Sequence, residues 1–273
     1  MTTAPAAALV NGLPGDCVTL QDRGLHYGDG LFETLRWERG QLRWFGRHMA
    51  RLEQGCERLG IVAPDHALLR AEGESLARGR SRAIVKFIVT RGAATRRGYR
   101  PGGDEQPTRI ACCYDWPTAD AAEFRLGLSA VPLGRNPLLA GIKHLNRLEQ
   151  VLAQQGAAEA GWHEAAMCAS GGAVVCGTMS NLFVRVGDEW LTPPLDDCGV
   201  SGIIRALLLE AAPRLGLGLR VAPLEVAALA MAPAMFVTNV RLGVQAVNWY
   251  QGRSLAVDAS CARLQEFLDG ADA

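Results

Sequence analysis

The sequence contains almost no lysine. Of its 28 basic residues, only Lys86 and Lys143 are lysines, and all the others are arginines. An arginine keeps its proton in a protein, whereas a neutral lysine can form a Schiff base or take a proton from carbon. Either lysine is therefore a candidate for amine chemistry, although a codon bias against lysine would leave the same two residues.

A charge excess and a long apolar run are also absent. The formal net charge is +0, which gives no indication of a nucleic-acid or anionic-membrane partner. No apolar run is long enough to span a bilayer, and the first residues lack the basic and apolar regions of a secretory signal. These features predict a cytoplasmic protein.

Cysteines with metal-ligand spacing are missing as well. The eight cysteines show no CxxC spacing, and they are interpreted as reduced thiols. Cys112 and Cys113 are adjacent, but neighbours on a strand point to opposite faces, so no metal site is expected. The sequence also lacks GxGxxG after a strand, GxxxxGK[ST] and GxSxG. The sequence therefore lacks the signatures of nucleotide-binding folds and of serine hydrolases with a GxSxG motif.

The order of the apolar segments predicts two domains of mixed α+β structure. A smaller N-terminal α/β domain is expected over 1–115, a linker over 116–122 and a larger C-terminal domain over 123–273. Hairpins outnumber βαβ units, which favours α+β over a regular α/β fold. Helices are predicted over 47–59, 65–78 and 144–160, from about Ile203, and after Ser260. Strands are predicted over 83–90, 109–114, 126–131, 235–239 and 245–250, with hairpins over 164–177 and 181–192.

Lys143 lies immediately before the predicted helix 144–160. Its neighbours Leu139 and Ile142 are apolar, and desolvation would lower the pKa of an amine held there. The alternative is a solvated lysine near a helix N-terminus, where the helix dipole disfavours a cation. The segment therefore favours a functional lysine over a surface one.

Several segments resemble, in the same order, the fold-type IV pyridoxal-phosphate family, also called class IV aminotransferases. LGRNPLLAGIKHLNRLEQVL resembles the cofactor-lysine segment of the family's aminodeoxychorismate lyases. DRGLHYGDGLFETLR resembles the first active-site loop, RHMARL the phosphate-arginine helix and TRGAATRRGY the lyase substrate loop. GTMSNLF and GVSGIIR resemble the cofactor loops. The resemblance runs from Asp22 to Val247, and it implies a two-domain fold like that of D-amino-acid aminotransferase.

The resemblance implies pyridoxal 5'-phosphate as the cofactor and assigns residues to it. Lys143 would form the Schiff base, and the guanidinium of Arg51 would bind the phosphate. For Arg51, a surface ion pair with Glu53 or Glu57 is the alternative.

Two further segments are assigned to the phosphate. The backbone of Ile203 and Ile204 opens a predicted helix, whose N–H groups favour an anion. Thr238 and Asn239 lie where another phosphate-side loop is expected.

Cys176 stands where the family usually has a glutamate that holds a proton on the pyridine nitrogen. A thiol is a weak partner for a pyridinium. Because β-elimination tolerates a poorer electron sink than transamination, this departure favours a lyase. The alternatives are an alignment slip or a carboxylate from elsewhere in the chain.

The implied substrate is 4-amino-4-deoxychorismate, converted to 4-aminobenzoate and pyruvate for folate biosynthesis by a homodimer. Arg97 and Lys86 are candidates for its carboxylates, with Tyr99 and His26 beside them. Thr34 would donate a proton to the departing group. Lys86 as a strand-edge solubiliser, and Thr34 as a strand residue without a role, remain open. The alternative functions are a D-amino-acid or branched-chain aminotransferase and a non-catalytic pyridoxal-phosphate carrier.

Overall fold

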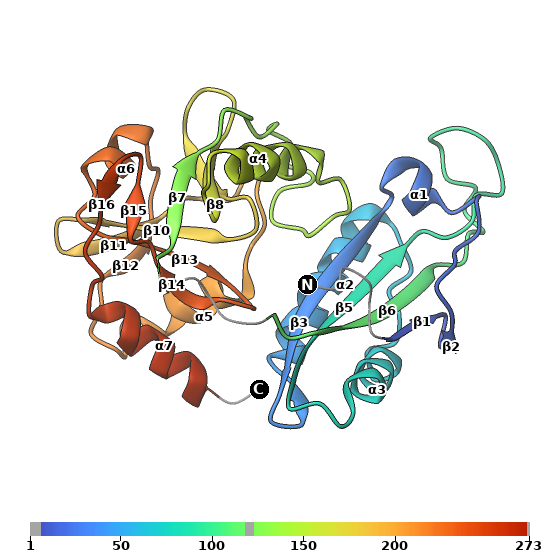
Figure 1. Cartoon of the computed structure of the whole chain (residues 1–273). Helices are drawn as coiled ribbons and strands as arrows, with labels where there is room; N and C mark the ends of the chain where they lie inside the picture. The colour runs from blue at the N-terminus through green and yellow to red at the C-terminus, as the bar shows by residue number, and fades with distance from the viewer. Residues whose placement is uncertain (1–6, 118–122, 272–273) are drawn as a thin grey trace. The chain divides into compact units, whose positions relative to one another are not determined.

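The computed structural model describes residues 7–117 and 123–271, which form two compact units (Figure 1). The N-terminal unit comprises residues 7–117 together with Ile142–Asn146, and the C-terminal unit comprises 123–141 and 147–271. Of the predicted linker 116–122, residues 118–122 lie outside the described residues. No helix among the described residues has the length and apolar character needed to cross a membrane.

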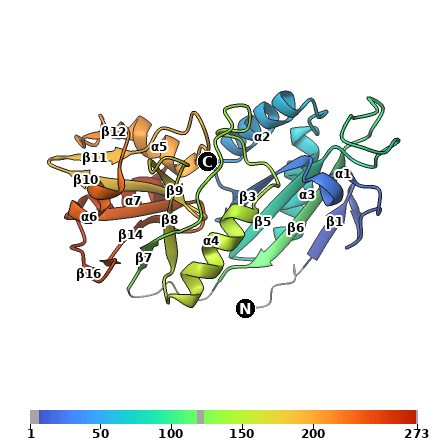
Figure 2. The same ribbon diagram turned by 90° about the horizontal axis from the view of Figure 1, so that it is seen from above.

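The N-terminal unit is built on one six-stranded sheet of order β2-β1-β6-β5-β3-β4, of which Figure 2 shows β1, β6, β5 and β3 side by side. All of its neighbouring strands are antiparallel. Its strands are β1 (Ala7–Val10), β2 (Leu13–Pro14), β3 (Gly30–Glu38), β4 (Gln41–Leu42), β5 (Arg82–Thr90) and β6 (Thr108–Asp115). Its helices are α1 (Arg23–Tyr27), α2 (Phe45–Leu59) and α3 (His66–Ala77).

Helices α2 and α3 cover the same face of this sheet. A side chain added at Gly55 of α2 would meet Leu31 of β3, and one at Gly73 of α3 would meet Phe87 of β5. Leu31 and Phe87 share a face, because Phe87 is directly opposite Glu33, which lies two residues after Leu31 on β3. The opposite face carries the partly exposed residues of β3 and β5.

Two helices of the N-terminal unit, α2 and α3, have caps that their sequences predict. Gly60 adopts φ +63° at the C-cap of α2 and donates its N–H to the carbonyls of Cys56 and Glu57, a conformation that glycine reaches without strain. Asp65 caps α3 by accepting a hydrogen bond from the N–H of Ala67. The predicted helices 47–59 and 65–78 are thus confirmed to within two residues.

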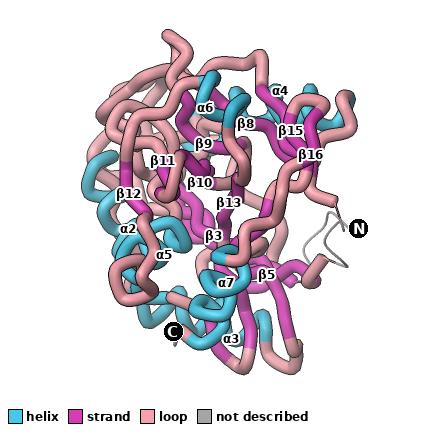
Figure 3. The backbone as a smooth tube through the Cα atoms, turned by 90° about the vertical axis from the view of Figure 1, so that its left-hand side faces the viewer, coloured by secondary structure: helices cyan, strands magenta, loops and turns pink. Residues whose placement is uncertain are grey.

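The C-terminal unit contains two five-stranded sheets, of orders β12-β11-β10-β13-β14 and β16-β15-β7-β8-β9. The first contains β10 (Asn181–Val186), β11 (Glu189–Thr192), β12 (Leu219–Val221), β13 (Met235–Asn239) and β14 (Gly243–Ala246). The second contains β7 (Arg125–Leu128), β8 (Glu164–Cys168), β9 (Val174–Gly177), β15 (Trp249–Tyr250) and β16 (Arg253–Ser254). The helices are α4 (Leu148–Glu159), α5 (Ile203–Ala211), α6 (Val226–Met231) and α7 (Ser260–Gly270), which Figure 3 colours cyan.

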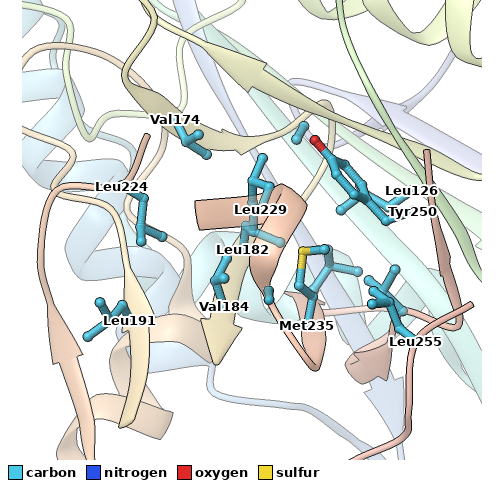
Figure 4. Packing of buried hydrophobic residues seen from close by; sticks show 14 of the residues in the cluster. Leu126, Val174, Leu182, Val184, Leu191, Leu224, Leu229, Met235, Tyr250 and Leu255 are labelled. Atoms are coloured by element: carbon cyan, nitrogen blue, oxygen red, sulfur yellow. The ribbon is translucent and has the colours of Figure 1, made fainter. Parts of the chain in front are cut away.

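A buried apolar cluster joins these two sheets into one core (Figure 4). Leu182 and Val184 of β10 and Met235 of β13 meet Leu126 of β7 and Tyr250 of β15 there. Burying such side chains contributes roughly 1.5–3 kcal/mol each. The predicted α+β class and both predicted hairpins are confirmed.

Three boundaries differ from the sequence prediction. The strand predicted over 126–131 ends at Leu128, and the one over 245–250 is divided into β14 and β15. The helix predicted over 144–160 begins only at Leu148. Leu148, Val151 and Leu152 are exposed on this helix, and the small residues Ala153 and Ala157 are the buried ones.

Candidate functional site

Lys143 lies on an extended segment that pairs with β3, not beside a helix N-terminus. The N–H of Phe32 donates to the Lys143 carbonyl at 2.9 Å, and the N–H of Leu145 donates to the Gly30 carbonyl at 2.9 Å. These backbone bonds explain why helix 144–160 starts late. They also place Lys143 in the N-terminal unit, although the sequence assigned it to the C-terminal domain.

The ring of Phe32 lies next to both lysines of the chain. Nζ of Lys143 is 4.4 Å from the ring centroid, and Nζ of Lys86 is 5.0 Å from it. Burial lowers the pKa of Lys86. Thr34 is directly opposite Lys86 in the β3–β5 pair, and directly opposed residues leave the same face of a sheet. Two amines, a hydroxyl and an aromatic ring thus share one region of the N-terminal unit.

Arg51 belongs to a buried cluster with Glu33 and His48. Its Nε donates to Oε1 of Glu33 at 2.7 Å and its Nη2 donates to Oε2 at 2.6 Å. Nδ1 of His48 lies 2.6 Å from the same Oε2. This bidentate pair with Glu33 fixes the direction of the guanidinium; the alternative offered by the sequence was a surface ion pair with Glu53 or Glu57.

The protonation states of this cluster follow from burial and charge. Burial alone would raise the pKa of Glu33, but the charge of Arg51 and the hydrogen bond from His48 outweigh it and lower the pKa to about 2. Burial lowers the pKa of His48, so the neutral ring donates its Nδ1–H to the carboxylate. Sequence reasoning missed Glu33 and His48. The signal was an acid at a core-facing position of a strand, between Leu31 and Leu35.

In the C-terminal unit, Cys176 is buried on β9. Burial raises the pKa of its thiol to about 12, with a smaller contribution from the charge of Glu164. The thiol is therefore neutral near pH 7 and cannot replace a carboxylate as an anion.

Glu164, on β8, is a second buried acid that sequence reasoning missed. Its Oε1 accepts hydrogen bonds from the N–H of Thr178 at 2.8 Å and from the Thr178 hydroxyl. Its Oε2 accepts from the N–H of Met179 at 3.1 Å and from Oγ of Ser180 at 2.8 Å. The carboxylate thus fixes the turn between β9 and β10. The sequence signal for Glu164 was an acidic residue at the first position of an apolar hairpin strand.

The start of α5 has the features of an anion-binding cradle. Its N-cap is Gly202, and no side chain caps the helix, so the first backbone N–H groups face outward from the helix end. A side chain at Gly202 would meet Oδ1 of Asn181 at 1.9 Å. The side chains of Ile203 and Ile204 are buried, which leaves their backbone as the part that can contact a ligand.

Thr238 and Asn239 end strand β13 next to this cradle. Thr238 is the register partner of Asn181, and its hydroxyl is buried without a hydrogen-bond partner among the described residues. A buried hydroxyl of this kind fits an absent acceptor such as a phosphate. Asn239 instead accepts from the N–H of Arg241 at 3.0 Å and donates to the carbonyl of Met179 at 3.3 Å, so its side chain holds loops together.

The predicted substrate residues of the 91–107 loop are on the surface. Arg97 is exposed, and the side chain of Tyr99 is 84% exposed. The Tyr99 ring packs edge-on against Tyr27 at 5.4 Å between centroids. Nε2 of His26 lies 2.6 Å from the Leu20 carbonyl.

Each unit by itself carries groups of a kind that pyridoxal phosphate, implied by the sequence, would need. The N-terminal unit presents an amine at Lys143 and a fixed guanidinium at Arg51. The C-terminal unit presents an uncapped helix start and an unsatisfied buried hydroxyl at Thr238. An attachment point and phosphate donors are the groups that such a cofactor needs.

Comparisons with known proteins agree with this chemistry. The chain is 33% identical over 265 residues to the aminodeoxychorismate lyase of Vibrio harveyi, covering 96% of this chain and 97% of that protein. It is 29% identical over 247 residues to the D-alanine aminotransferase of Bacillus licheniformis, covering 89% and 86%. The crystal structure of 4-amino-4-deoxychorismate lyase from Pseudomonas aeruginosa has a TM-score of 0.89 and 38% identity, covering 97% of this chain and 99% of that one. Residues 30–250 match the family described as Amino-transferase class IV. The predicted fold type is confirmed, and the chain belongs to the class IV aminotransferase family.

Proposed function

We propose that this protein is a pyridoxal-phosphate-dependent lyase that converts 4-amino-4-deoxychorismate to 4-aminobenzoate and pyruvate. The observation that carries the proposal is the common placement of Lys143, Thr34 and Lys86 around the Phe32 ring. This arrangement offers a base, a proton donor and a cation for a carboxylate, which are the three groups that the elimination requires.

Lys143 would hold the cofactor, pyridoxal phosphate, through its amine, and the bound cofactor would supply an electron sink for the substrate's amine-bearing carbon. In the N-terminal unit Arg51 would supply a donor for its phosphate. In the C-terminal unit the backbone N–H groups of Ile203 and Ile204 and the Thr238 hydroxyl would supply others. Glu33 keeps the guanidinium of Arg51 in a fixed direction.

The chain's own residues move the protons. Lys143 takes the proton from the carbon that bears the substrate amine, and the bond to the enolpyruvyl oxygen on the adjacent carbon breaks. The Thr34 hydroxyl donates a proton to the departing group, which leaves as pyruvate, and the remaining ring becomes aromatic. Lys86 and Arg97 hold the two substrate carboxylates, and Lys86 does so from a partly buried position, where a charge pair is stronger than in water.

A class IV aminotransferase acting on D-amino or branched-chain amino acids is the second candidate. The neutral thiol of Cys176 favours the lyase over this alternative. A transaminase needs a protonated ring nitrogen with an anionic partner to stabilise a long-lived carbanion, whereas an elimination expels its leaving group and needs less of that help.

A pair of assays tests the proposal. Purified protein with added pyridoxal phosphate is given 4-amino-4-deoxychorismate, and pyruvate and 4-aminobenzoate are measured. In parallel it is given D-alanine or L-leucine with 2-oxoglutarate. Equal amounts of both products are expected from the first assay, and Lys143→Ala should abolish them together with the absorbance band of the bound cofactor. Amino transfer without pyruvate release from the first substrate would overturn the lyase.

We also propose that the protein is a cytoplasmic homodimer. The exposed face of α4 that carries Leu148, Val151 and Leu152 supports association, because neighbouring apolar side chains at helical spacing often form protein contacts. Light scattering of the purified protein should give twice the chain mass, and Val151→Glu should shift the mass toward that of one chain.

A further inference from the structure

Arg23 is a buried cation that the proposed chemistry does not use. It is the first residue of α1 and only 3% exposed. Its Nε donates to Oδ2 of Asp29 at 2.8 Å, its Nη1 to the Gly98 carbonyl at 3.1 Å and its Nη2 to the Tyr99 carbonyl at 2.7 Å. All three guanidinium nitrogens are therefore engaged, two of them with consecutive carbonyls of the 91–107 loop.

The base of that loop is held by backbone hydrogen bonds. The N–H of Arg23 donates to the Gly92 carbonyl at 2.8 Å, and the N–H of Ala94 donates to the Gln21 carbonyl at 2.8 Å. The far side closes on itself, because the Thr95 hydroxyl donates to Asp104 at 2.8 Å and the N–H of Gly103 donates to Glu105 at 2.8 Å.

The tip of the loop, residues 96–100, is exposed throughout. Within the described residues, the hydrogen bonds that join this tip to the rest of the chain both come from Arg23. Its guanidinium also lies 4.9 Å from the centre of the Tyr27 ring, which packs edge-on against the ring of Tyr99. Arg23 therefore binds the backbone of Tyr99 directly and contacts the ring of Tyr27, against which the Tyr99 ring packs.

The charges around Asp29 explain why an arginine suits position 23. Asp29 also accepts from Arg91, at 2.8 and 3.1 Å, so two guanidinium groups share one carboxylate. Arg91 directs its remaining bonds to the Leu59 and Gly60 carbonyls at the end of α2, each at 2.7 Å. Arg23 directs its remaining bonds to the loop, where a planar fork reaches two carbonyls that an ammonium group would not reach together.

We propose that Arg23 is a positioning residue that holds Arg97–Tyr99 in place, and that it thereby sets the affinity of the protein for a carboxylate-bearing substrate. It does not contact the reacting atoms. The link to substrate affinity rests on the proposed function, in which Arg97 binds a carboxylate. The link to loop order rests on the contacts of Arg23 alone.

Limited trypsin digestion of the whole protein tests the loop order without any activity assay. Trypsin cuts after Arg96 and Arg97, which are exposed. Cutting after Arg97 should be about tenfold faster in Arg23→Met, because two charge-assisted hydrogen bonds to the tip are lost. Arg91→Met is the matched control, since it removes the other partner of Asp29 but leaves the tip attached. Equal cutting rates in the wild type and Arg23→Met would overturn the proposal.

Steady-state kinetics test the consequence for substrate binding. Arg23→Met should raise KM for 4-amino-4-deoxychorismate about tenfold and leave kcat and the cofactor absorbance within about twofold. A fall in kcat at unchanged KM would overturn the role in affinity.

The second variant, Arg23→Lys, keeps the charge beside Asp29 and serves if Arg23→Met does not fold. Its cutting rate and KM should lie between those of the wild type and Arg23→Met, and wild-type values for both would contradict the proposal. If the protein is not a lyase, the digestion still tests whether Arg23 orders the loop. Failure of the proposed function and failure of the role of Arg23 can therefore be told apart.

Discussion

Thr34 and Lys86 are directly opposed in the antiparallel pair of β3 and β5. Side chains at directly opposed positions leave the same face, with Cβ atoms about 4.5–5.5 Å apart. The Phe32 ring, two residues before Thr34, connects this pair to Lys143. A hydroxyl, a cation and the amine of Lys143 are thereby placed by backbone pairing within one unit of the chain.

Lys86→Met should weaken substrate binding. Losing a partly desolvated charge–carboxylate contact costs about 1.5–3 kcal/mol, which corresponds to roughly a 10- to 100-fold rise in KM. Lys86→Arg, which keeps the charge, should lose less. Arg82→Met is the matched control on the same strand, because Arg82 is exposed and pairs with Glu38 at 2.8 Å. A KM for Lys86→Met equal to that of the control would assign Lys86 to a surface role.

Thr34→Val should slow the reaction rather than weaken binding. Valine has nearly the same shape but no hydroxyl, so only proton donation to the departing group is removed. General acid catalysis contributes about 10²–10⁴-fold, and kcat should fall by about 10²-fold while KM changes little. Thr34→Ser restores the hydroxyl and should recover most of the rate. An unchanged kcat in Thr34→Val would remove Thr34 from the mechanism.

The sequence was sufficient for residues whose neighbours along the chain form a distinctive segment. The caps Asp65 and Gly60 were predicted in this way and are confirmed, and segments of the same kind assigned Lys143 and Arg51 to the cofactor. It was insufficient for Glu33 and Glu164, because their side-chain partners lie 14 or more residues away along the chain and each acid interrupts an apolar pattern only once. The late start of α4 was missed because pairing with β3 outweighs helix propensity at 144–147.

Acid should destabilise the protein through Glu33. Its folded-state pKa of about 2 lies below the ordinary value of 4.5. The ionised carboxylate therefore stabilises the fold above about pH 4.5, and this contribution, about 3 kcal/mol, is lost as the pH falls through about 2. In urea unfolding at pH 7 and pH 3, Glu33→Gln should start less stable and lose less on acidification. Glu53→Gln, on α2 with a side chain that is 62% exposed, should behave like the wild type.

Cys176 should not influence the pH dependence of activity. With a thiol pKa of about 12, it carries no charge between pH 6 and 9. The pH profiles of kcat for the wild type and Cys176→Ala should therefore have the same shape, and cofactor absorbance should persist in the variant. A shifted limb in Cys176→Ala would show that the thiol titrates in this range, contrary to its burial.

Glu164→Gln should loosen the turn at 178–180. An amide offers one acceptor oxygen in place of two, so the N–H of Met179 or that of Thr178 is left without its acceptor. An unsatisfied buried donor costs about 1–3 kcal/mol, which urea unfolding should detect. Because this turn leads into Asn181 beside the α5 cradle, a pyridoxal-phosphate titration should also show about tenfold weaker binding. Glu159→Gln, at the exposed end of α4, is the control for losing a carboxylate. Stability loss with unchanged cofactor affinity would limit Glu164 to a structural role.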